Sequence, residues 1–219
     1  MIIERAGTDL AVRVLRVSEE LERAVARQDV LSGGELKRVA AQVRQEDRDR
    51  YLVAHTVLRQ ELADRLGVRP ADVELTRNPC PSCGGPHGRP GLSRGDGPYF
   101  SLSHTGDVVL LAFAGTPVGI DVEAPPLTTS VASVSRGLHP REQEELADLP
   151  REERATAFIR CWTRKEAYLK GVGVGIGGGV AEPYVSTLPR PGQPPGWRLT
   201  DLGADSLPAG YTAALAEKE

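Results

Sequence analysis

The sequence predicts an α+β protein built from two similar halves that meet near residues 115–117. Residues 10–17 alternate apolar and other side chains, as a half-buried strand does, and residues 48–66 repeat apolar side chains at helical spacing. Each half also offers a strand, one or more helices and then further strands. The 219 residues suffice for one large domain or two small ones. We therefore expect an N-terminal half over 1–116 and a C-terminal half over 117–219.

In the N-terminal half, the helices are expected to follow the first strand directly. Ser18 can cap a helix because its hydroxyl can accept a hydrogen bond from a free backbone N–H group. Gly67 can end a long helix because glycine adopts the left-handed conformation without strain. Helices are expected over 18–27, 35–43 and 48–66, followed by a Pro- and Gly-rich loop over 78–98.

The middle and the end of the chain return to strands. Gly115-Thr116-Pro117 predicts a hairpin between the strands at 108–114 and 118–122. The glycine-dense residues 171–179 predict the end of a helix and a hinge. The remaining elements are a strand over 99–103, helices over 141–149 and 151–170, and strands near 184–187, 197–202 and 211–216.

Composition and charge exclude several classes of protein. The 27 Lys and Arg against 30 Asp and Glu give a net charge of -3, which excludes a globally basic nucleic-acid binder but leaves room for a local basic patch. The sequence contains no apolar run near the ~20 residues that span a bilayer, and its start does not resemble a signal peptide. With only three cysteines, a disulfide framework is not expected. We expect a cytoplasmic protein with no nucleic-acid or membrane partner.

Asp121 and Glu123 form the first group of residues that could carry chemistry. In a strand, Ile120 and Val122 point to one side, whereas the two carboxylates point to the other. Two carboxylates so close repel each other, and a hard cation such as Mg²⁺ between them would remove the repulsion. Taken alone, the same alternation is more typical of a strand with a solvated acidic face.

Glu166 lies on the apolar stripe of the predicted helix over 151–170. A carboxylate in that position is costly unless it is paired or bound to a metal. One interpretation is an ordinary ion pair with Lys170, four residues further on. The functional interpretation makes Glu166 a third metal ligand or a general base, with Lys165 and Lys170 facing an anionic substrate.

Ser103 and His104 end the strand over 99–103, and both side chains can donate to a phosphate oxygen. A serine hydrolase is not expected, because the chain has no Gly-x-Ser-x-Gly turn. Arg50, at the start of a helix, and Arg89, in the loop Gly88-Arg89-Pro90, could clamp a phosphate. The alternatives are a polar turn for the first pair and ordinary solvated side chains for the two arginines.

Two further patterns are not expected to be functional. Cys80, Cys83 and His87 resemble half a zinc site, but no second Cys/His pair follows at the spacing of a zinc finger or ribbon. We therefore expect no zinc site here. The glycine run over 171–179 follows a helix, whereas a phosphate-binding loop joins a strand to a helix.

In their order and spacing, four of these segments together resemble the Sfp-type 4'-phosphopantetheinyl transferases. The resemblance covers roughly residues 35–175, and the loop over 80–90 looks like the version found in actinomycete members. Two departures are visible, since many relatives have Lys where this chain has Arg89, and Ser where it has Thr105. The matching segments are Gly88-Arg89-Pro90, Phe100-Ser101-Leu102-Ser103-His104, Val118-Gly119-Ile120-Asp121-Val122-Glu123 and Trp162-Thr163-Arg164-Lys165-Glu166-Ala167-Tyr168-Leu169-Lys170.

The resemblance implies an activity, a fold and partners. Members of this family transfer phosphopantetheine from coenzyme A to a serine of an apo acyl or peptidyl carrier protein, releasing 3',5'-ADP. Such carriers serve polyketide, nonribosomal peptide or fatty acid synthesis. The implied fold is a monomeric pseudo-dimer of two α/β halves with coenzyme A in the cleft between them.

The resemblance also assigns roles to residues. Asp121, Glu123 and Glu166 would hold Mg²⁺, and Glu166 would also be the base. Lys170 would contact the pyrophosphate, and Ser103 with His104 the phosphates of the nucleotide end, where a protonated His104 would favour a dianion. Lys165 would face the anionic substrate. Arg50 and Arg89, with Lys37 or Arg38, would hold the 3'-phosphate and adenine end.

Two alternatives belong to other classes of protein. One is a non-catalytic module that binds coenzyme A or a carrier protein, although a dead copy would not need Asp121, Glu123, Glu166 and Lys170 together. The other is a zinc-dependent adaptor that uses Cys80 and Cys83.

Overall fold

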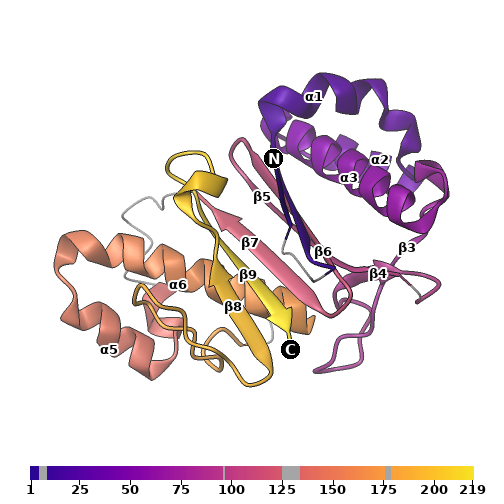
Figure 1. The fold of residues 1–219 in the computed structure, drawn as a ribbon. Helices are drawn as coiled ribbons and strands as arrows, with labels where there is room; N and C mark the ends of the chain where they lie inside the picture. The colour runs from indigo at the N-terminus through magenta and orange to yellow at the C-terminus, as the bar shows by residue number, and fades with distance from the viewer. Residues whose placement is uncertain (5–8, 96, 125–133, 176–178) are drawn as a thin grey trace.

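Two antiparallel sheets packed face to face, with helices on their outer sides, make up the chain (Figure 1). The structure is a computed structural model, and it describes residues 1–4, 9–95, 97–124, 134–175 and 179–219. From one side to the other the layers are helices, sheet, sheet and helices. The α+β class expected from the sequence is confirmed.

The first sheet comes from the N-terminal part of the chain. Its strand order is β1-β2-β6-β5, and every neighbouring pair is antiparallel. Helix α3 packs on its outer face, with α1 and α2 beside α3. The strands are β1 (Ile2–Glu4), β2 (Ala11–Arg16), β5 (Tyr99–Thr105) and β6 (Val108–Ala114), and the helices are α1 (Val17–Ala26), α2 (Gly33–Ala41) and α3 (Gln45–Leu66).

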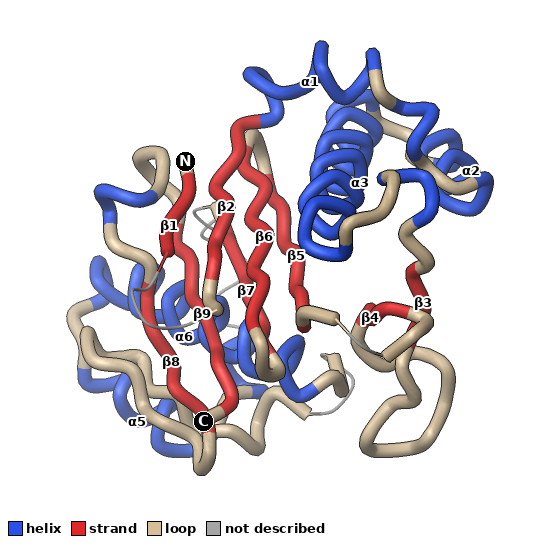
Figure 2. Tube along the Cα trace, turned by 45° about the vertical axis from the view of Figure 1, so that its right-hand side comes forward, coloured by secondary structure: helices blue, strands red, loops and turns tan. Residues whose placement is uncertain are grey.

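The second sheet comes from the C-terminal part and has the order β7-β9-β8. Helix α6 covers its outer face, and α5 packs against α6 (Figure 1). These elements are β7 (Val118–Glu123), α5 (Pro140–Asp148), α6 (Arg151–Val172), β8 (Trp197–Asp201) and β9 (Thr212–Lys218). A small hairpin of β3 (Leu75–Arg77) and β4 (Pro90–Leu92) lies apart from both sheets (Figure 2), and short 3₁₀ turns occupy Gln28–Val30, Pro70–Asp72, Ser135–Gly137 and Ala204–Ser206.

Strand β6 shows how the sequence produces these layers. Its seven residues are all apolar and all buried, because the strand is covered on both faces. Leu110 and Ala112 face the second sheet, where they meet Ile120 of β7. Leu111 and Phe113 face α3 and the rest of the helical layer. An apolar run without alternation therefore marks the strand at the centre of the molecule.

The two sheets are joined along β5 and β7 by serine side chains. The Ser101 hydroxyl accepts a hydrogen bond from the Ile120 N–H at 3.1 Å, and the Ser103 hydroxyl accepts one from the Val122 N–H at 3.4 Å. These hydroxyls satisfy N–H groups at the edge of β7 that no strand pairs with on that side. These two hydrogen bonds hold β5 in a fixed position relative to β7. They thereby also fix the positions of the polar side chains on both strands.

The expected helices and most expected strands are present, but three predictions were wrong. Ser18 does not cap the first helix, because α1 begins at Val17 with Arg16 at its N-cap. Residues 115–117 do not close a hairpin, because β6 pairs with β2 and β5, whereas β7 pairs with β9 in the other sheet. Residues 184–187 form no strand. Strand β1 and the β3–β4 hairpin were not predicted from the sequence.

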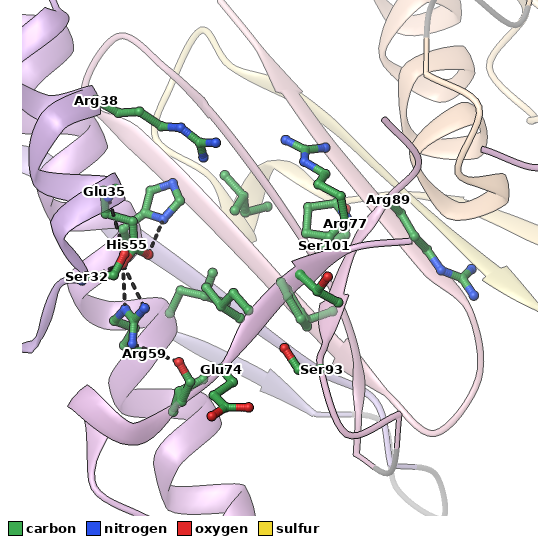
Figure 3. Close-up of a pocket in the computed structure, with 18 of the residues that line it drawn as sticks. Ser32, Glu35, Arg38, His55, Arg59, Glu74, Arg77, Arg89, Ser93 and Ser101 are labelled. Carbon is green, nitrogen blue, oxygen red and sulfur yellow. Dashed lines mark hydrogen bonds and ion pairs between the residues drawn. The ribbon is translucent and has the colours of Figure 1, made fainter. Parts of the chain in front are cut away.

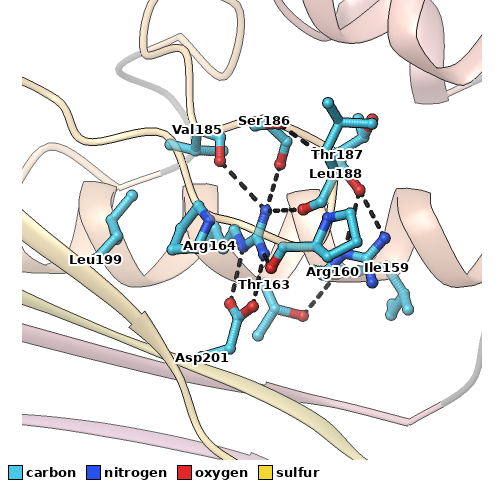
Figure 4. A network of polar contacts seen from close by, with 12 residues as sticks. Ile159, Arg160, Thr163, Arg164, Val185, Ser186, Thr187, Leu188, Leu199 and Asp201 are labelled. Carbon is cyan, nitrogen blue, oxygen red and sulfur yellow. Dashed lines mark hydrogen bonds and ion pairs between the residues drawn. The ribbon is translucent and has the colours of Figure 1, made fainter.

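A buried arginine explains why residues 184–187 form no strand (Figure 4). The Arg164 guanidinium donates to the carbonyls of Ser186 at 2.7 Å and Leu188 at 2.9 Å, and it forms an ion pair with Asp201 of β8. The backbone of this segment is therefore hydrogen-bonded to a side chain of α6, and its carbonyls are not free to join a sheet.

The described residues contain no helix with the length and apolar character needed to cross a membrane.

Candidate active site between β5, β7 and α6

Asp121, Ser103 and Lys170 form a hydrogen-bonded group where β5, β7 and α6 meet. Lys170 Nζ lies 2.5 Å from Asp121 Oδ1 and 2.9 Å from Ser103 Oγ, and the Ser103 hydroxyl donates to Asp121 Oδ1 at 2.7 Å. The Asp121 side chain is buried, whereas that of Lys170 remains 29% exposed. A molecule from solvent therefore reaches the buried Asp121 carboxylate from the side where Lys170 lies.

A glycine in β7 allows α6 to lie close enough for these contacts. A Cβ atom built on Gly119 would lie 1.9 Å from the carbonyl oxygen of Ala167 and 2.4 Å from the backbone nitrogen of Gly171. Only a residue without a side chain fits between strand and helix at this point. The close approach brings Glu166 and Lys170, which flank this contact on α6, beside Asp121.

Three carboxylates share this corner, and the pKa of each is raised. Burial, followed by the charges of Asp121 and Glu123, raises the pKa of Glu166 to about 7. Burial and the charge of Asp121 also raise the pKa of Glu123. Burial raises the pKa of Asp121 even though Lys170 and Ser103 contact its carboxylate. A single lysine therefore does not neutralise the group, and an added cation would be favourable.

The donor atoms suit Mg²⁺, and one of them is unused. Among the described residues, Asp121 Oδ2 is buried and has no hydrogen-bond partner. Carboxylate oxygens are the ligands that Mg²⁺ takes, usually one or two from the protein together with waters and phosphate oxygens. The oxygens of Asp121, Glu123 and Glu166 do not all approach within 4.8 Å of one another in the part of the chain described. The residues therefore fit an ion that completes its shell with water and substrate.

A cavity of about 850 Å³ opens beside this group (Figure 3). This volume is in the range of sites for small molecules and cofactors. Lys170 lies at its wall, and so do Ser101 and Arg89. Arg38 extends from α2 on one side, and Arg77 and Arg89 lie across the cavity on the β3–β4 side. Of the two alternatives Lys37 and Arg38, Arg38 is the residue at the cavity.

Arg89 joins the β3–β4 side of the cavity to the end of α6. Its guanidinium donates to the Gly171 carbonyl at 2.9 Å and lies over the Tyr99 ring at 4.7 Å from the centroid. Gly173, in the left-handed conformation, ends α6 against the Arg89 side chain. The helix stop expected at the glycine run is present, although residues 176–178 of that run lie outside the described residues.

A buried ion cluster that the sequence analysis missed forms the opposite wall. Glu35 accepts hydrogen bonds from the Ser32 backbone and hydroxyl and from Arg59 at 2.8 Å, and it contacts His55 at 3.2 Å. Burial disfavours the charged form, but the bonds from His55 and Ser32 and the charge of Arg59 outweigh it and lower the pKa of Glu35 to about 2. The spacing Ser32-x-x-Glu35, typical of a capping box, was the available signal.

Arg50 and His104 lie together beyond the residues that line the cavity. Arg50 pairs with Asp47 and donates to the Gly106 carbonyl at 3.2 Å. Desolvation, followed by the positive charges of Arg50 and Lys170, lowers the pKa of His104 to about 4. The ring is therefore neutral near pH 7, and a contact between His104 and a phosphate would be a hydrogen bond from a neutral imidazole.

Comparison with known proteins identifies the family. The family model of the 4'-phosphopantetheinyl transferase superfamily matches residues 117–210. The chain is 30% identical over 184 residues to a putative 4'-phosphopantetheinyl transferase of Synechocystis, covering 79% of this chain and 72% of the relative. It is 34% identical over 185 residues to the 4'-phosphopantetheinyl transferase HetI of Nostoc, covering 80% of this chain and 74% of HetI. The chain belongs to the 4'-phosphopantetheinyl transferase superfamily. It is also 25% identical over 132 residues to the transferase Sfp of Bacillus subtilis, covering 60% of this chain and 55% of Sfp.

One residue assigned to the site of this transferase lies elsewhere. Lys165 is fully buried, pairs with Glu142 of α5 at 2.7 Å and donates to the Pro183 carbonyl at 2.5 Å. The expectation that Lys165 faces the substrate is therefore wrong. One residue along a helix turns the side chain by about 100°, so Lys165 points to α5 when Glu166 points to β7.

The transferase also brings together Cys80, Cys83 and His87. Their ligand atoms lie within 4.8 Å of one another, which is the spacing of a metal site. The sequence argument against zinc relied on the missing second pair of ligands. It did not consider that the three residues present could themselves converge.

Proposed function

We propose that this transferase moves the 4'-phosphopantetheine group of coenzyme A onto a serine of an apo acyl or peptidyl carrier protein, with Mg²⁺, and releases 3',5'-ADP. The observation that carries the proposal is the position of Lys170. Its ammonium group reaches Asp121 and Ser103 on one side and borders the 850 Å³ cavity on the other. The carboxylates of Glu123 and Glu166 stand next to the same contact.

In this proposal, positive side chains orient the anionic substrate. Lys170 holds the pyrophosphate, because it is the cation that links the cavity to the acidic corner. Arg89, fixed to α6 through Gly171, and Arg38 across the cavity hold the nucleotide end. Ser103 and His104 donate to phosphate oxygens at the end of β5. Arg50 of α3 contributes beside the β5–β6 turn, where it donates to the Gly106 carbonyl and stands close to His104.

The acidic side chains have two roles in this proposal, which are to bind the metal ion and to accept a proton. Asp121, Glu123 and Glu166 would hold Mg²⁺, which supplies charge neutralisation at the pyrophosphate. The carrier serine oxygen forms a bond to the β-phosphorus of coenzyme A as the bond from that phosphorus to the bridging oxygen breaks. Glu166 accepts the proton of the serine hydroxyl, and 3',5'-ADP leaves. Such a reaction is accelerated by aligning the reactants and by neutralising the charge on the phosphates. The enzyme therefore needs no nucleophile of its own.

The two-half organisation is part of the proposal. With residues 1–116 and 117–219 as halves, β2, β5 and β6 correspond to β7, β8 and β9. In each set the first strand is followed by helices, and the last strand lies in the middle of the sheet, in the orders β2-β6-β5 and β7-β9-β8. The shared topology supports a pseudo-dimer within one chain, which acts as a monomer. The free thiols of Cys80, Cys83 and Cys161 support a reducing, cytoplasmic setting.

Intact mass spectrometry tests the activity and its partner together. The purified protein is incubated with Mg²⁺, coenzyme A and a panel of apo carriers from polyketide, nonribosomal peptide and fatty acid synthesis. We expect at least one carrier to gain the mass of one phosphopantetheine, and its Ser→Ala variant to gain none. Binding of coenzyme A without transfer to any carrier would support the non-catalytic module instead.

A further inference from the structure

A second cluster of ligand-type side chains lies in the loop between β3 and β4, outside the carboxylate site. The sulfur atoms of Cys80 and Cys83 and a ring nitrogen of His87 lie within 4.8 Å of one another, and Cys83 Sγ is 3.0 Å from His87 Nε2. Two ligands on one tetrahedral Zn²⁺, at ordinary Zn–S and Zn–N lengths, stand about 3.6 Å apart. The distances between the three atoms therefore differ from that value by no more than about 1.2 Å, and a small movement of the side chains lets them share an ion.

The backbone builds this cluster. The Cys80 N–H donates to the Gly85 carbonyl at 2.8 Å, and the Gly84 N–H donates to the Cys80 carbonyl at 2.8 Å. Gly84 closes the turn in the left-handed conformation, at φ 72°. The backbone of Ser82 and Cys83 also forms hydrogen bonds to the Cys80 sulfur. The turn therefore holds this sulfur atom in place.

Gly85 leaves room for the histidine ring. A Cβ atom built on Gly85 would lie 2.9 Å from His87 Cδ2 and 3.4 Å from Cys83 Sγ. A side chain at this position would force the ring away from the sulfur atoms. The loop is therefore shaped so that His87 folds back over the turn formed by Cys80 to Gly85.

We propose that Cys80, Cys83 and His87 bind one Zn²⁺ ion, which fixes the loop between β3 and β4. Two thiolates and one imidazole form a donor set that suits zinc and does not suit Mg²⁺. Cys80 is buried, whereas Cys83 and His87 are exposed, so the fourth position of a tetrahedral site faces solvent and takes a water molecule. The site is distinct from the carboxylate corner in both position and chemistry.

The expected role of the ion is structural. His87, Gly88 and Arg89 border the large cavity directly after the metal-binding turn. The Arg89 carbonyl accepts a hydrogen bond from Asn78 at 3.0 Å, and the Arg77 side chain donates to the Gly88 carbonyl at 3.1 Å. Zinc would lock the turn that precedes this wall, and so hold Arg89 against Gly171. The effect on coenzyme A rests on the proposed function, whereas the binding of zinc does not.

Metal content and cobalt spectroscopy test the site itself. We expect the full chain, produced with zinc in the medium, to hold about one equivalent of Zn²⁺. Replacement by Co²⁺ should give thiolate-to-cobalt charge-transfer absorption with intense ligand-field bands typical of tetrahedral coordination. Cys83→Ser and His87→Asn should each weaken Zn²⁺ affinity by more than ~100-fold. Arg94→Ala, a change at an exposed residue just beyond β4 that removes no ligand, should leave affinity unchanged.

Three results would overturn the proposal: zinc content near zero with no Co²⁺ charge-transfer band, unchanged affinity in both ligand variants, or a Cys80–Cys83 disulfide in protein purified without reductant. Circular dichroism of the variants checks that they fold, and hydrogen exchange of residues 78–90 with and without Zn²⁺ gives a readout that does not depend on activity. If zinc binds and no carrier is modified, the proposed function fails and the zinc site stands.

Discussion

Replacing Gly119 with alanine tests whether α6 lies directly on β7. The added Cβ would stand 1.9 Å from the Ala167 carbonyl oxygen, which is 1.5 Å short of the 3.4 Å at which ordinary contact begins. The obstacle is helix backbone, so no rotamer change relieves it. Overpacking of this kind costs about 1–3 kcal/mol or more, and the loss of glycine's freedom in the unfolded chain returns only about 0.4–1 kcal/mol.

We therefore expect Gly119→Ala to lower the free energy of unfolding by about 2 kcal/mol, which corresponds to roughly 4–8 °C in Tm for a chain of this size. Urea denaturation and thermal unfolding measure it. Activity should fall as well, because Glu166 and Lys170 move away from Asp121 with the helix. Gly203→Ala is the matched control, since Gly203 has no neighbour within 4 Å and a φ of -66°. Equal stability of the two variants would refute the close packing.

Two further predictions concern Arg50, which lies beyond the cavity lining, and Glu35, which lies in the wall opposite the carboxylates. Arg50→Ala should raise the KM for coenzyme A several-fold with little change in kcat, because Arg50 lies beside His104 and not among the carboxylates; an unchanged KM in steady-state kinetics would remove Arg50 from the site. The folded-state pKa of Glu35 is about 2 and its usual value is 4.5, so its contribution to stability is present above pH 4.5 and is lost as the pH falls toward 2. Glu35→Gln should therefore lower stability at pH 7 by ~2 kcal/mol, after allowance for solvent screening, and by much less near pH 2. Urea unfolding across this range would contradict the assignment if both proteins showed the same pH dependence.

The elements that the sequence predicted well are those with a strong local pattern. The alternation of Asp121 and Glu123 with Ile120 and Val122 placed both carboxylates on the α6 side of β7, because side-chain direction in a strand depends only on residue parity. The helix ends at Gly67 and Gly173 followed from the same kind of local rule. These features can be predicted without knowing how the rest of the chain packs.

The features that the sequence analysis missed depend on distant partners. The turn at 115–117 looks like a hairpin, but strand pairing is decided by which sheet each strand joins. Lys165 and Lys170 are indistinguishable as cations, and only the position of Glu142 on α5 shows that one is buried in an ion pair. Residues 184–187 have high strand propensity, but they form no strand because Arg164 hydrogen-bonds to their backbone. Tertiary contacts override local preference in each of these cases.

The central claim is that the carboxylates around Lys170 perform the transfer with a divalent ion. Its most direct test is the rate of holo-carrier formation, followed by intact mass, for wild-type protein and for Asp121→Ala and Glu166→Gln, with Mg²⁺ and with a chelator. We predict transfer by the wild type with Mg²⁺ only, and no transfer by either variant although both keep the wild-type circular dichroism spectrum. Wild-type rates in both variants, or transfer that survives the chelator, would contradict it.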